Sequence, residues 1–337
     1  MPINRDLSGV PRRTEAGLPP SKHPFAVTAL AEKFYEQYVN TGAALAIPEA
    51  GNYRASYTSK RCDRQLYYAL AGVEPSNPVT IADIWRFALG ELVHTALQSA
   101  RGAAHPEALH EPHVDLRPLG IDGSGHVDVL DSDLLIELKS INGFSFKMTS
   151  TSMKGPPQGP RYGAVVQAAL LAAGINAAGH VLVPEIDEDG EVELHQVDVE
   201  EIKRIVVGYL SLELVGPGMV DVIVNDDDDF GREVARFTAE WHFTMDELQP
   251  IAEYEVGRIR RIKHMVERKQ IPVRALHDPE YPAGAVISSP KVKSAPWQLV
   301  DGDVVEDSGT TWFCGYCPHI DQCVADGPGS PGEDIDI

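Results

Sequence analysis

The order of apolar and polar residues predicts helices in the first hundred residues. Apolar residues recur at intervals of three and four in residues 25–38 (FAVTALAEKFYEQY) and 59–70 (SKRCDRQLYYAL), where Ser59 is the expected N-cap. A third helix is expected over residues 81–100. Residues 1–23 are rich in proline, glycine and charge, so we expect them to form a flexible arm.

Farther along the chain, apolar and polar residues alternate, which predicts strands. The expected strands cover residues 112–116, 125–130 and 134–140. The turn residues DSD separate the last two, so the three strands should form a β-meander. A helix over residues 162–173, closed by Gly174, and an apolar strand at 180–184 follow. Strand, helix and strand in this order imply a crossover connection and an α/β core.

The second half of the chain continues with mixed elements. We expect a strand near 191–197, a helix near 199–214, a strand near 236–243 and a long helix over about 245–269. The residues after that helix show no regular period until a cysteine cluster near the C-terminus. Residues 24–323 should therefore form one domain, followed by a disordered acidic tail at 324–337.

Charge seems at first to exclude a polyanionic partner. The 337 residues include 29 Lys and Arg against 50 Asp and Glu, a net charge of −21. Much of the acid lies in expected loops or at the end of the chain, whereas basic residues gather near 54–64, near 139–161 and in 257–274. A local basic path for DNA therefore remains open. No stretch approaches the roughly 18 apolar residues of a membrane span, so we expect a cytoplasmic protein with no membrane partner.

Four cysteines suggest a metal site that joins distant parts of the chain. Cys62 lies in the early helix, and Cys314, Cys317 and Cys323 lie in FCGYCPHIDQC. Four thiolates satisfy a tetrahedral zinc ion or an iron–sulfur cubane. Structural zinc sites usually have two close ligand pairs, so one cysteine apart from three suits a [4Fe–4S] cluster better. Two alternatives stay open at this point, namely a zinc site and four unrelated buried thiols.

Two neighbouring strands carry a second candidate metal site. Asp128 lies on the strand GHVDVL, and Glu137 and Lys139 lie on LLIELKS, where a period of two puts them on one face. Carboxylates projecting from adjacent strands form a hard-oxygen site for Mg²⁺ or Mn²⁺, which activates water. Charged residues on a hairpin often lie on a face that is simply exposed to solvent. The run Leu134–Ile136 indicates a buried strand, where an unpaired glutamate and lysine would be costly.

Two polar residues on otherwise apolar helices complete the set of candidates. His94 lies in WRFALGELVHTALQ and Gln167 in RYGAVVQAALLAAG. Each has an ordinary interpretation, as a core histidine or as a hydrogen-bonded amide. Each can also face the metal site if its helix packs on the strand pair.

Together these residues resemble the PD-(D/E)xK nuclease superfamily in its RecB-like branch. In particular they resemble the CRISPR-associated Cas-four exonucleases and AddB-type nuclease domains that carry a cysteine-bound cluster. In the family's order, the motifs are C-D-R at 62–64, G-x3-H at 90–94, G-x2-D at 125–128, E-x-K at 137–139, Gln167 and C-x2-C-x5-C at 314–323. The chain departs from the family pattern Q-x3-Y, because Leu171 stands where the tyrosine is expected.

The resemblance implies a restriction-endonuclease-like α/β fold, with a mixed central sheet flanked by helices. It divides the domain into a helical part at 24–105, a nuclease core at 106–200 and a C-terminal helical and cluster region at 201–323. It implies that His94, Asp128 and Glu137 bind catalytic Mg²⁺ or Mn²⁺, with Lys139 and Gln167 in the catalytic set. It also implies that Cys62, Cys314, Cys317 and Cys323 hold a [4Fe–4S] cluster.

The function implied is a DNA exonuclease acting on single-stranded or frayed DNA. Relatives of this kind occur in tailed phages, which would place the chain in a host cytoplasm. No Walker motif is present, so a helicase or a recombination or CRISPR-type protein would supply unwinding. The alternatives are a non-catalytic DNA-binding or assembly module of the same fold and, less favoured, an iron–sulfur electron carrier.

Overall fold

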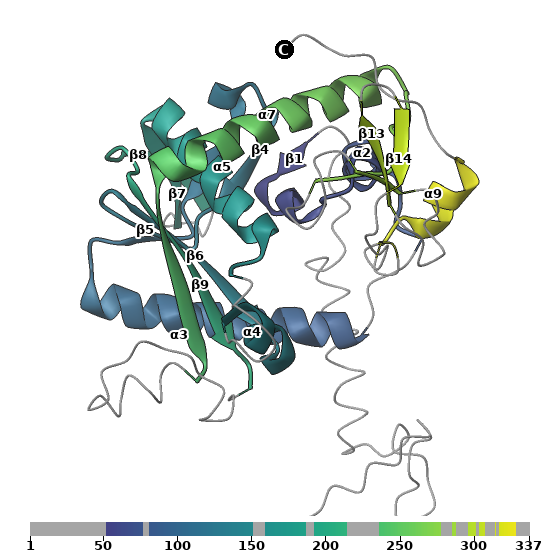
Figure 1. The fold of residues 1–337 in the computed structure, drawn as a ribbon. Helices are drawn as coiled ribbons and strands as arrows, with labels where there is room; N and C mark the ends of the chain where they lie inside the picture. The colour runs from purple at the N-terminus through teal and green to yellow at the C-terminus, as the bar shows by residue number, and fades with distance from the viewer. Residues whose placement is uncertain are drawn as a thin grey trace, which may run out of the picture. The chain divides into compact units, whose positions relative to one another are not determined.

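The fold is that of a computed structural model of the chain, shown in Figure 1. The residues that it describes are 52–76, 81–150, 159–186, 192–213, 236–277, 285–287, 296–300, 303–306, 314 and 317–327. The chain divides into two units, one of residues 1–47 and 79–89 and the other of residues 48–78 and 90–337. The second unit carries all the candidate residues. The expected arm at 1–23 and helix at 25–38 lie outside the described residues.

Two five-stranded mixed sheets form the second unit's α/β framework. The first sheet has the order β1 (Tyr53–Arg54), β4 (Gly123–His126), β3 (His113–Asp115), β7 (His180–Ile186) and β8 (Val192–Asp198). The second has the order β10 (Thr238–Thr244), β9 (Arg204–Ser211), β6 (Leu134–Ile141), β5 (Val129–Asp131) and β2 (Leu109–His110). Only the pairs β1–β4 and β6–β9 are parallel among these strands.

Six α-helices and a smaller sheet complete the described elements. The helices are α2 (Asp63–Leu70), α3 (Ile81–Ala104), α4 (Gly143–Ser150), α5 (Tyr162–Ala178), α7 (Met245–Glu267) and α9 (Ile320–Ala325), with 3-10 turns at Ala55–Ser59 and Arg117–Leu119. The third sheet is antiparallel, in the order β11 (Ala275–Leu276), β12 (Ala285–Ile287), β13 (Pro296–Val300) and β14 (Asp303–Glu306). No helix of the described residues is long and apolar enough to cross a membrane.

Helix α5 is the centre of the core. It contacts strands of both mixed sheets, namely β3, β7, β6 and β9, and α7 also lies along it (Figure 1). Its residues from Ala164 to Ile175 are buried apart from Gln167, as expected for a helix that is apolar on every side. Gln167 is the one half-buried residue in this otherwise buried run.

The predicted end of α5 at Gly174 is wrong. The helix continues to Ala178 and is closed by Gly179, whose φ of +74° is the left-handed conformation that glycine adopts readily. Gly174 has a packing role instead, because a Cβ at that position would lie 2.9 Å from a methyl carbon of Leu116.

The predicted β-meander is also wrong. The expected strand at 125–130 is two strands, β4 and β5, which belong to different sheets. The chain leaves the first sheet after His126 and enters the second at Val129, and buried Val127 lies between them. The crossover that begins at β6 is likewise longer than predicted, because the parallel partner of β6 is β9 rather than β7.

The helix predicted near 199–214 is strand β9. It lies between β6 and β10, and its residues from Ile205 to Tyr209 are buried. A short apolar run buried on both faces has the same sequence pattern in a helix and in a central strand. The β-branched residues of RIVVGYLS were the available signal for a strand.

Two further predictions need correction. The early helix begins at Asp63 with Cys62 as N-cap, because Ser59 ends a 3-10 turn and donates its hydroxyl to Ser56 O. The region after α7, predicted to be irregular, contains strands β11 to β14. The predictions of α3, β7, β8, β10 and α7 are confirmed to within a few residues. Helix α7 begins with a capping box between Thr244 and Glu247.

Candidate active site and cysteine cluster

The hairpin of β5 and β6 brings the two acidic candidates together. Val129 pairs with Ile136, so one step along the ladder Asp128 lies opposite Glu137. Opposed residues of an antiparallel pair share a face of the sheet. The backbone N–H of Leu138 donates to Asp128 Oδ2 over 2.5 Å and fixes that carboxylate.

Glu137 is a buried carboxyl group, 1% exposed, whose Oε1 forms an ion pair with Lys139. Its Oε2 has no hydrogen-bond partner among the described residues. Burial raises the pKa of Glu137 to about 7, against the effect of the Lys139 cation and with the support of the Asp128 charge. Buried polar groups normally have partners. A divalent cation coordinated by these oxygens would provide one, so the residue fits a metal ligand.

Lys139 contacts both Glu137 and Gln167. Lys139 Nζ forms an ion pair with Glu137 and lies 3.4 Å from Gln167 Oε1, which α5 supplies. Burial lowers the pKa of Lys139, but the charges of Glu137 and Asp128 outweigh burial and raise it above its usual value. Lys139 is therefore a cation at neutral pH and suits charge stabilisation better than proton abstraction.

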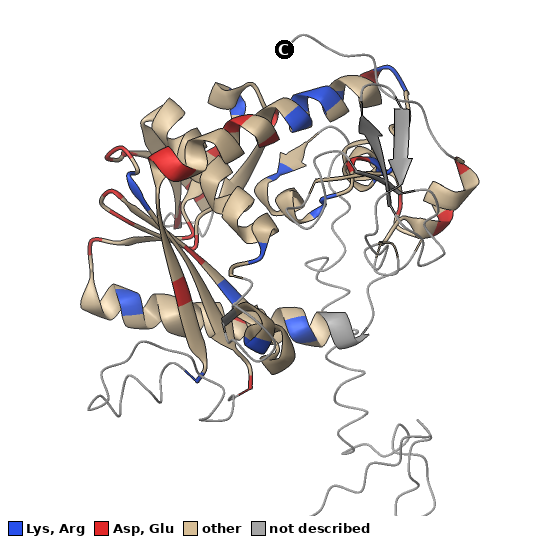
Figure 2. Ribbon diagram, viewed as in Figure 1, with Lys and Arg blue, Asp and Glu red and all other residues tan. Residues whose placement is uncertain are grey.

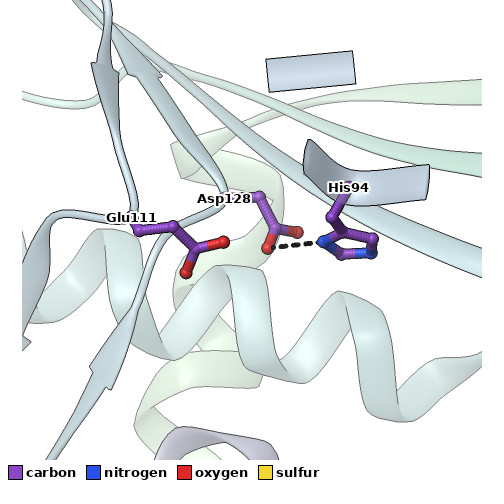
Figure 3. A group of neighbouring side chains, drawn as sticks. All are labelled: His94, Glu111 and Asp128. Atoms are coloured by element: carbon purple, nitrogen blue, oxygen red, sulfur yellow. Dashed lines mark ion pairs between the residues drawn. The ribbon is translucent and has the colours of Figure 1, made fainter. Parts of the chain in front are cut away.

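Helix α3 places His94 against the hairpin. His94 Nδ1 lies 3.3 Å from Asp128 Oδ1 (Figure 3). The hydrogen bond with Asp128 raises the pKa of His94. Gly90, one turn earlier, explains the close approach, because a Cβ there would lie 2.9 Å from Ser140 Oγ on β6. The G-x3-H spacing thus has a steric reason as well as a chemical one.

Glu111 joins this site and was missed from the sequence. One ligand atom each from His94, Glu111 and Asp128 lies within 4.8 Å of the other two, and Figure 3 shows Asp128 between its neighbours. Glu111 has a φ of +52°, and its carboxylate accepts a hydrogen bond from Gln98 over 2.6 Å. Glu137 is outside this group of three. Nothing in the sequence around Glu111 separates it from the many other acidic residues of the chain.

A second group of potential ligands lies at the other end of β5. Atoms of His105, Glu107 and Asp131 lie within 4.8 Å of one another. Asp131 already forms an ion pair with Arg101, which offsets its charge. This group is therefore a weaker candidate for a cation than the group around Asp128.

The four cysteines meet in one cavity. It is lined by Cys62, Arg64, Gln65, Tyr68, Arg274, Leu276, Cys314, Cys317, Ile320 and Cys323. Cys62 is the N-cap residue of α2, Cys323 lies on α9, and none of the four cysteines forms a disulfide bond. Burial raises the pKa of Cys314 to about 12, so a bound metal would be needed to keep it a thiolate.

Two buried arginines face the cysteines. Arg274 Nε donates to Cys323 Sγ over 3.3 Å, and Arg64 Nη1 lies 3.8 Å from the same sulfur. Arg64 is fully buried, and its other acceptors are backbone carbonyls, such as Pro272 O at 2.8 Å. Among the described residues no carboxylate pairs with Arg64, and its Nη2 has no hydrogen-bond partner. A buried guanidinium of this kind requires a nearby negative charge. Neutral thiols do not provide that charge, whereas metal-bound thiolates do.

The spacing of the thiols bears on the kind of metal. Within the described part of the chain, no three of the cysteine sulfurs lie within 4.8 Å of one another. Four sulfurs around one zinc ion would be about 3.8 Å apart, because each would lie about 2.3 Å from the ion. In a cubane cluster each thiolate binds a different iron, which spaces the sulfurs more widely.

Residues 61–64 connect this cavity to a buried ion network. Cys62 and Arg64 line the cavity, whereas Arg61 and Asp63 pair with residues of α7. The pairs are Arg61–Glu255 at 3.1 Å, Asp63–Arg258 at 2.8 Å, Glu255–Arg258 at 2.9 Å, Asp63–Arg261 at 2.6 Å and Asp63–His277 at 3.0 Å. The C-D-R motif therefore joins the cysteine cavity to α7 rather than forming only a metal site.

The basic segment at 257–274 contacts the protein itself. Besides Arg258 and Arg261, Arg260 donates to Leu119 O over 2.5 Å and Lys263 pairs with Asp122 at 3.0 Å. Figure 2 shows the blue residues along α7. The segment therefore offers less free positive charge to DNA than the sequence suggested.

Residues 324–327, which were expected to belong to the acidic tail, have a described structure. Val324–Gly327 are part of the described chain, and Tyr68 donates its hydroxyl to Asp326 over 2.7 Å. Gly327 O accepts hydrogen bonds from Arg64 and Arg274, the latter at 2.9 Å. Residues from 328 onward lie outside the described part of the chain.

Comparisons with known proteins give no relative for this chain. No family model, no curated protein and no solved structure matches it.

Proposed function

We propose that this chain is a divalent-metal-dependent deoxyribonuclease of the RecB-like branch of the PD-(D/E)xK superfamily, acting as an exonuclease on single-stranded or frayed DNA. The observation that carries the proposal is the environment of Glu137. Its carboxylate is paired with Lys139, its Oε2 has no hydrogen-bond partner among the described residues, and the charges of Asp128 and His94 act on its pKa. A solvated charged hairpin would leave these groups in water, whereas Glu137 is 1% exposed.

Each residue has a distinct part in such a site. Asp128 and Glu137 would hold Mg²⁺ or Mn²⁺ from adjacent strands, and His94 would add a nitrogen ligand from α3. When bound, the ion would lower the pKa of water so that it can attack phosphorus. Lys139, held by Glu137 and Gln167, would stabilise the negative charge that develops on the phosphate.

Glu111 would add a fourth ligand, the third that is an oxygen, from the side of Asp128 opposite His94 (Figure 3). Its position within 4.8 Å of ligand atoms of both His94 and Asp128 supports this role. Because its side chain is hydrogen bonded to Gln98, it is held near the site by the same helix that carries His94. Glu111 would therefore help to bind the ion rather than supply a base.

We further propose that the four cysteines hold a [4Fe–4S] cluster with a structural role. The buried, positively charged Arg64 supports bound thiolates over neutral thiols. The position of one cysteine far from the other three along the chain suits a cubane better than a single zinc ion. The cluster would join α2, the region after α7 and α9 across more than two hundred residues of chain.

The nuclease proposal is tested with anaerobically purified full-length protein and end-labelled single-stranded and duplex DNA, with Mn²⁺ or with EDTA. We expect Mn²⁺-dependent release of nucleotides from single-stranded ends. Asp128→Ala and Lys139→Ala should each abolish cleavage, since one removes a metal ligand and the other the cation next to it. The matched controls are Glu201→Gln and Lys203→Ala, which change exposed side chains outside the candidate site.

The outcomes separate the competing functions. Cleavage by Asp128→Ala or Lys139→Ala at the wild-type rate would show that the site is elsewhere. DNA binding without cleavage by the wild type would instead favour a non-catalytic binding or assembly module. Iron and sulfide analysis of the same preparation tests the cluster independently, and one stoichiometric zinc in colourless protein would contradict the iron–sulfur assignment alone.

A further inference from the structure

Helix α4 presents an exposed aromatic side chain beside the candidate active site. Phe144 is 74% exposed, and Met148, one turn later, is 38% exposed. Phe146 of the same helix is fully buried, and Thr149 is buried as well. The helix therefore has a packed face and an exposed apolar face, and the exposed face lacks a partner within the described residues.

The helix that carries the exposed Phe144 is anchored by several hydrogen bonds and by its buried face. Asn142 Oδ1 accepts a hydrogen bond from Ser145 N over 2.8 Å, which caps the first turn. Phe146 N donates to Asn142 O over 2.9 Å, and its ring is anchored in the core. Leu212 N donates to Ile141 O over 2.9 Å and ties the end of β6 to the chain after β9. A frayed helix therefore does not account for the exposed ring.

The position of α4 links it to the catalytic candidates. Lys139 is on β6, and Phe144 follows five residues later, so their Cα atoms lie within about 17 Å of each other. That span corresponds to roughly five nucleotides of one strand, at about 3.4 Å each. Figure 1 shows α4 next to the ends of β6 and β9. A single strand of about five nucleotides bound at Lys139 is therefore long enough to reach the Phe144 ring.

We propose that Phe144 stacks on an unpaired base of a single DNA strand and so guides that strand to the site. This inference rests on the proposed nuclease function and specifies the form of DNA that the site accepts. An exposed phenyl ring is a platform for any base, because every base has a π face.

A protein partner or a second copy fits this face less well. Stable protein interfaces bury about 800 Å² on each partner. The exposed apolar part of α4 consists of two side chains one turn apart, which is far smaller than such an interface. An unpaired base matches the size of this patch.

The test measures binding of a fluorescent single-stranded oligonucleotide to full-length protein in EDTA, where metal-dependent cleavage does not occur. Phe144→Ala should weaken binding by about 5- to 150-fold, the factor expected for the loss of one aromatic–base stack. Phe144→Trp should restore binding, and the fluorescence of the introduced indole should be quenched by DNA. Val192→Ala, which truncates another exposed apolar residue on β8, is the matched control and should bind as wild type.

The oligonucleotide arms define what would overturn the inference. Wild type and Phe144→Ala should bind equally to an abasic strand and to a blunt duplex. Equal affinity of wild type and Phe144→Ala for the normal strand would refute the stacking role. The stacking role would also be refuted if Phe144→Ala lost as much affinity for the abasic strand as for the normal strand. If the wild type sediments as a dimer and Phe144→Ala sediments as a monomer, the exposed face of α4 serves self-association instead. If Phe144-dependent binding occurs but Mn²⁺ produces no cleavage, the nuclease proposal fails while the stacking inference stands.

Discussion

Replacing Asp63 by asparagine should strongly destabilise the unit that carries the candidate site. Asp63 is 2% exposed and pairs with Arg258 at 2.8 Å, Arg261 at 2.6 Å and His277 at 3.0 Å. Asparagine keeps the shape of the side chain but removes its charge. Among the carboxylates of the described residues Arg258 would retain Glu255 alone, and His277 would lose its ion pair with Asp63. Arg261, whose side chain is 36% exposed, can turn to solvent.

The size of the effect follows from burial. Removing one partner of a buried ion pair costs about 3–5 kcal/mol, because the remaining charge stays buried without compensation. Unfolding free energies of whole domains are about 5–15 kcal/mol, so this loss is a large fraction of the total. Asp133→Asn is the matched control. Its partner Arg204 is at the surface, so solvent replaces the pair and the loss should be far smaller.

The measurement is urea unfolding of the intact, anaerobically purified protein, followed by circular dichroism. Wild type should also show a specific dependence on pH. Burial raises the pKa of Asp63, but its bond with His277 and the charges of Arg258 and Arg261 outweigh burial and hold the pKa well below its ordinary value. The stability from this group is therefore present above pH about 4 and is lost as pH falls further. The Asp63→Asn variant should lack that part of the acid sensitivity.

Two results would refute this reasoning. The first is a free energy of unfolding for Asp63→Asn that matches Asp133→Asn. The second is an unchanged acid dependence of the variant relative to wild type. Either result would mean that the network around Asp63 is hydrated or rearranges without cost.

Three further predictions concern the site, the cluster and the tail. In EDTA, the free energy of unfolding of the wild type should fall as pH rises from about 4.5 to about 7, because burial gives Glu137 a pKa of about 7 in the folded state. Urea unfolding of Glu137→Gln should not show this fall. Cys317→Ala should lower iron content, solubility and melting temperature, with activity falling as a consequence, as absorbance, metal analysis and calorimetry would show. Truncation after Gly327 should leave cleavage and stability unchanged in the same assays. Truncation after Val324 should lower the melting temperature, because it removes Asp326, the acceptor of Tyr68, and Gly327 O, the acceptor of Arg64.

The sequence by itself determined the elements whose signals are local. The capping box at Thr244 and Glu247 and the long amphipathic pattern after it specify α7 without reference to the rest of the fold. The alternation and turn around residues 131–133 likewise specify the β5–β6 hairpin, and this hairpin fixes Asp128 opposite Glu137. The residues of the candidate site that the hairpin carries were therefore within reach of sequence reasoning.

Only the tertiary structure decided the features that depend on contacts between distant residues. The run RIVVGYLS becomes β9 because β6 and β10 flank it, and Gly174 stays inside α5 because Leu116 leaves no room for a side chain. Glu111 reaches Asp128 through the fold rather than through any spacing in the sequence. The same holds for Arg64, because only the fold places its charge in the cavity that the four cysteines line. Periodicity and capping act within a few residues, whereas burial and charge compensation depend on which surfaces meet, and only the folded chain determines that.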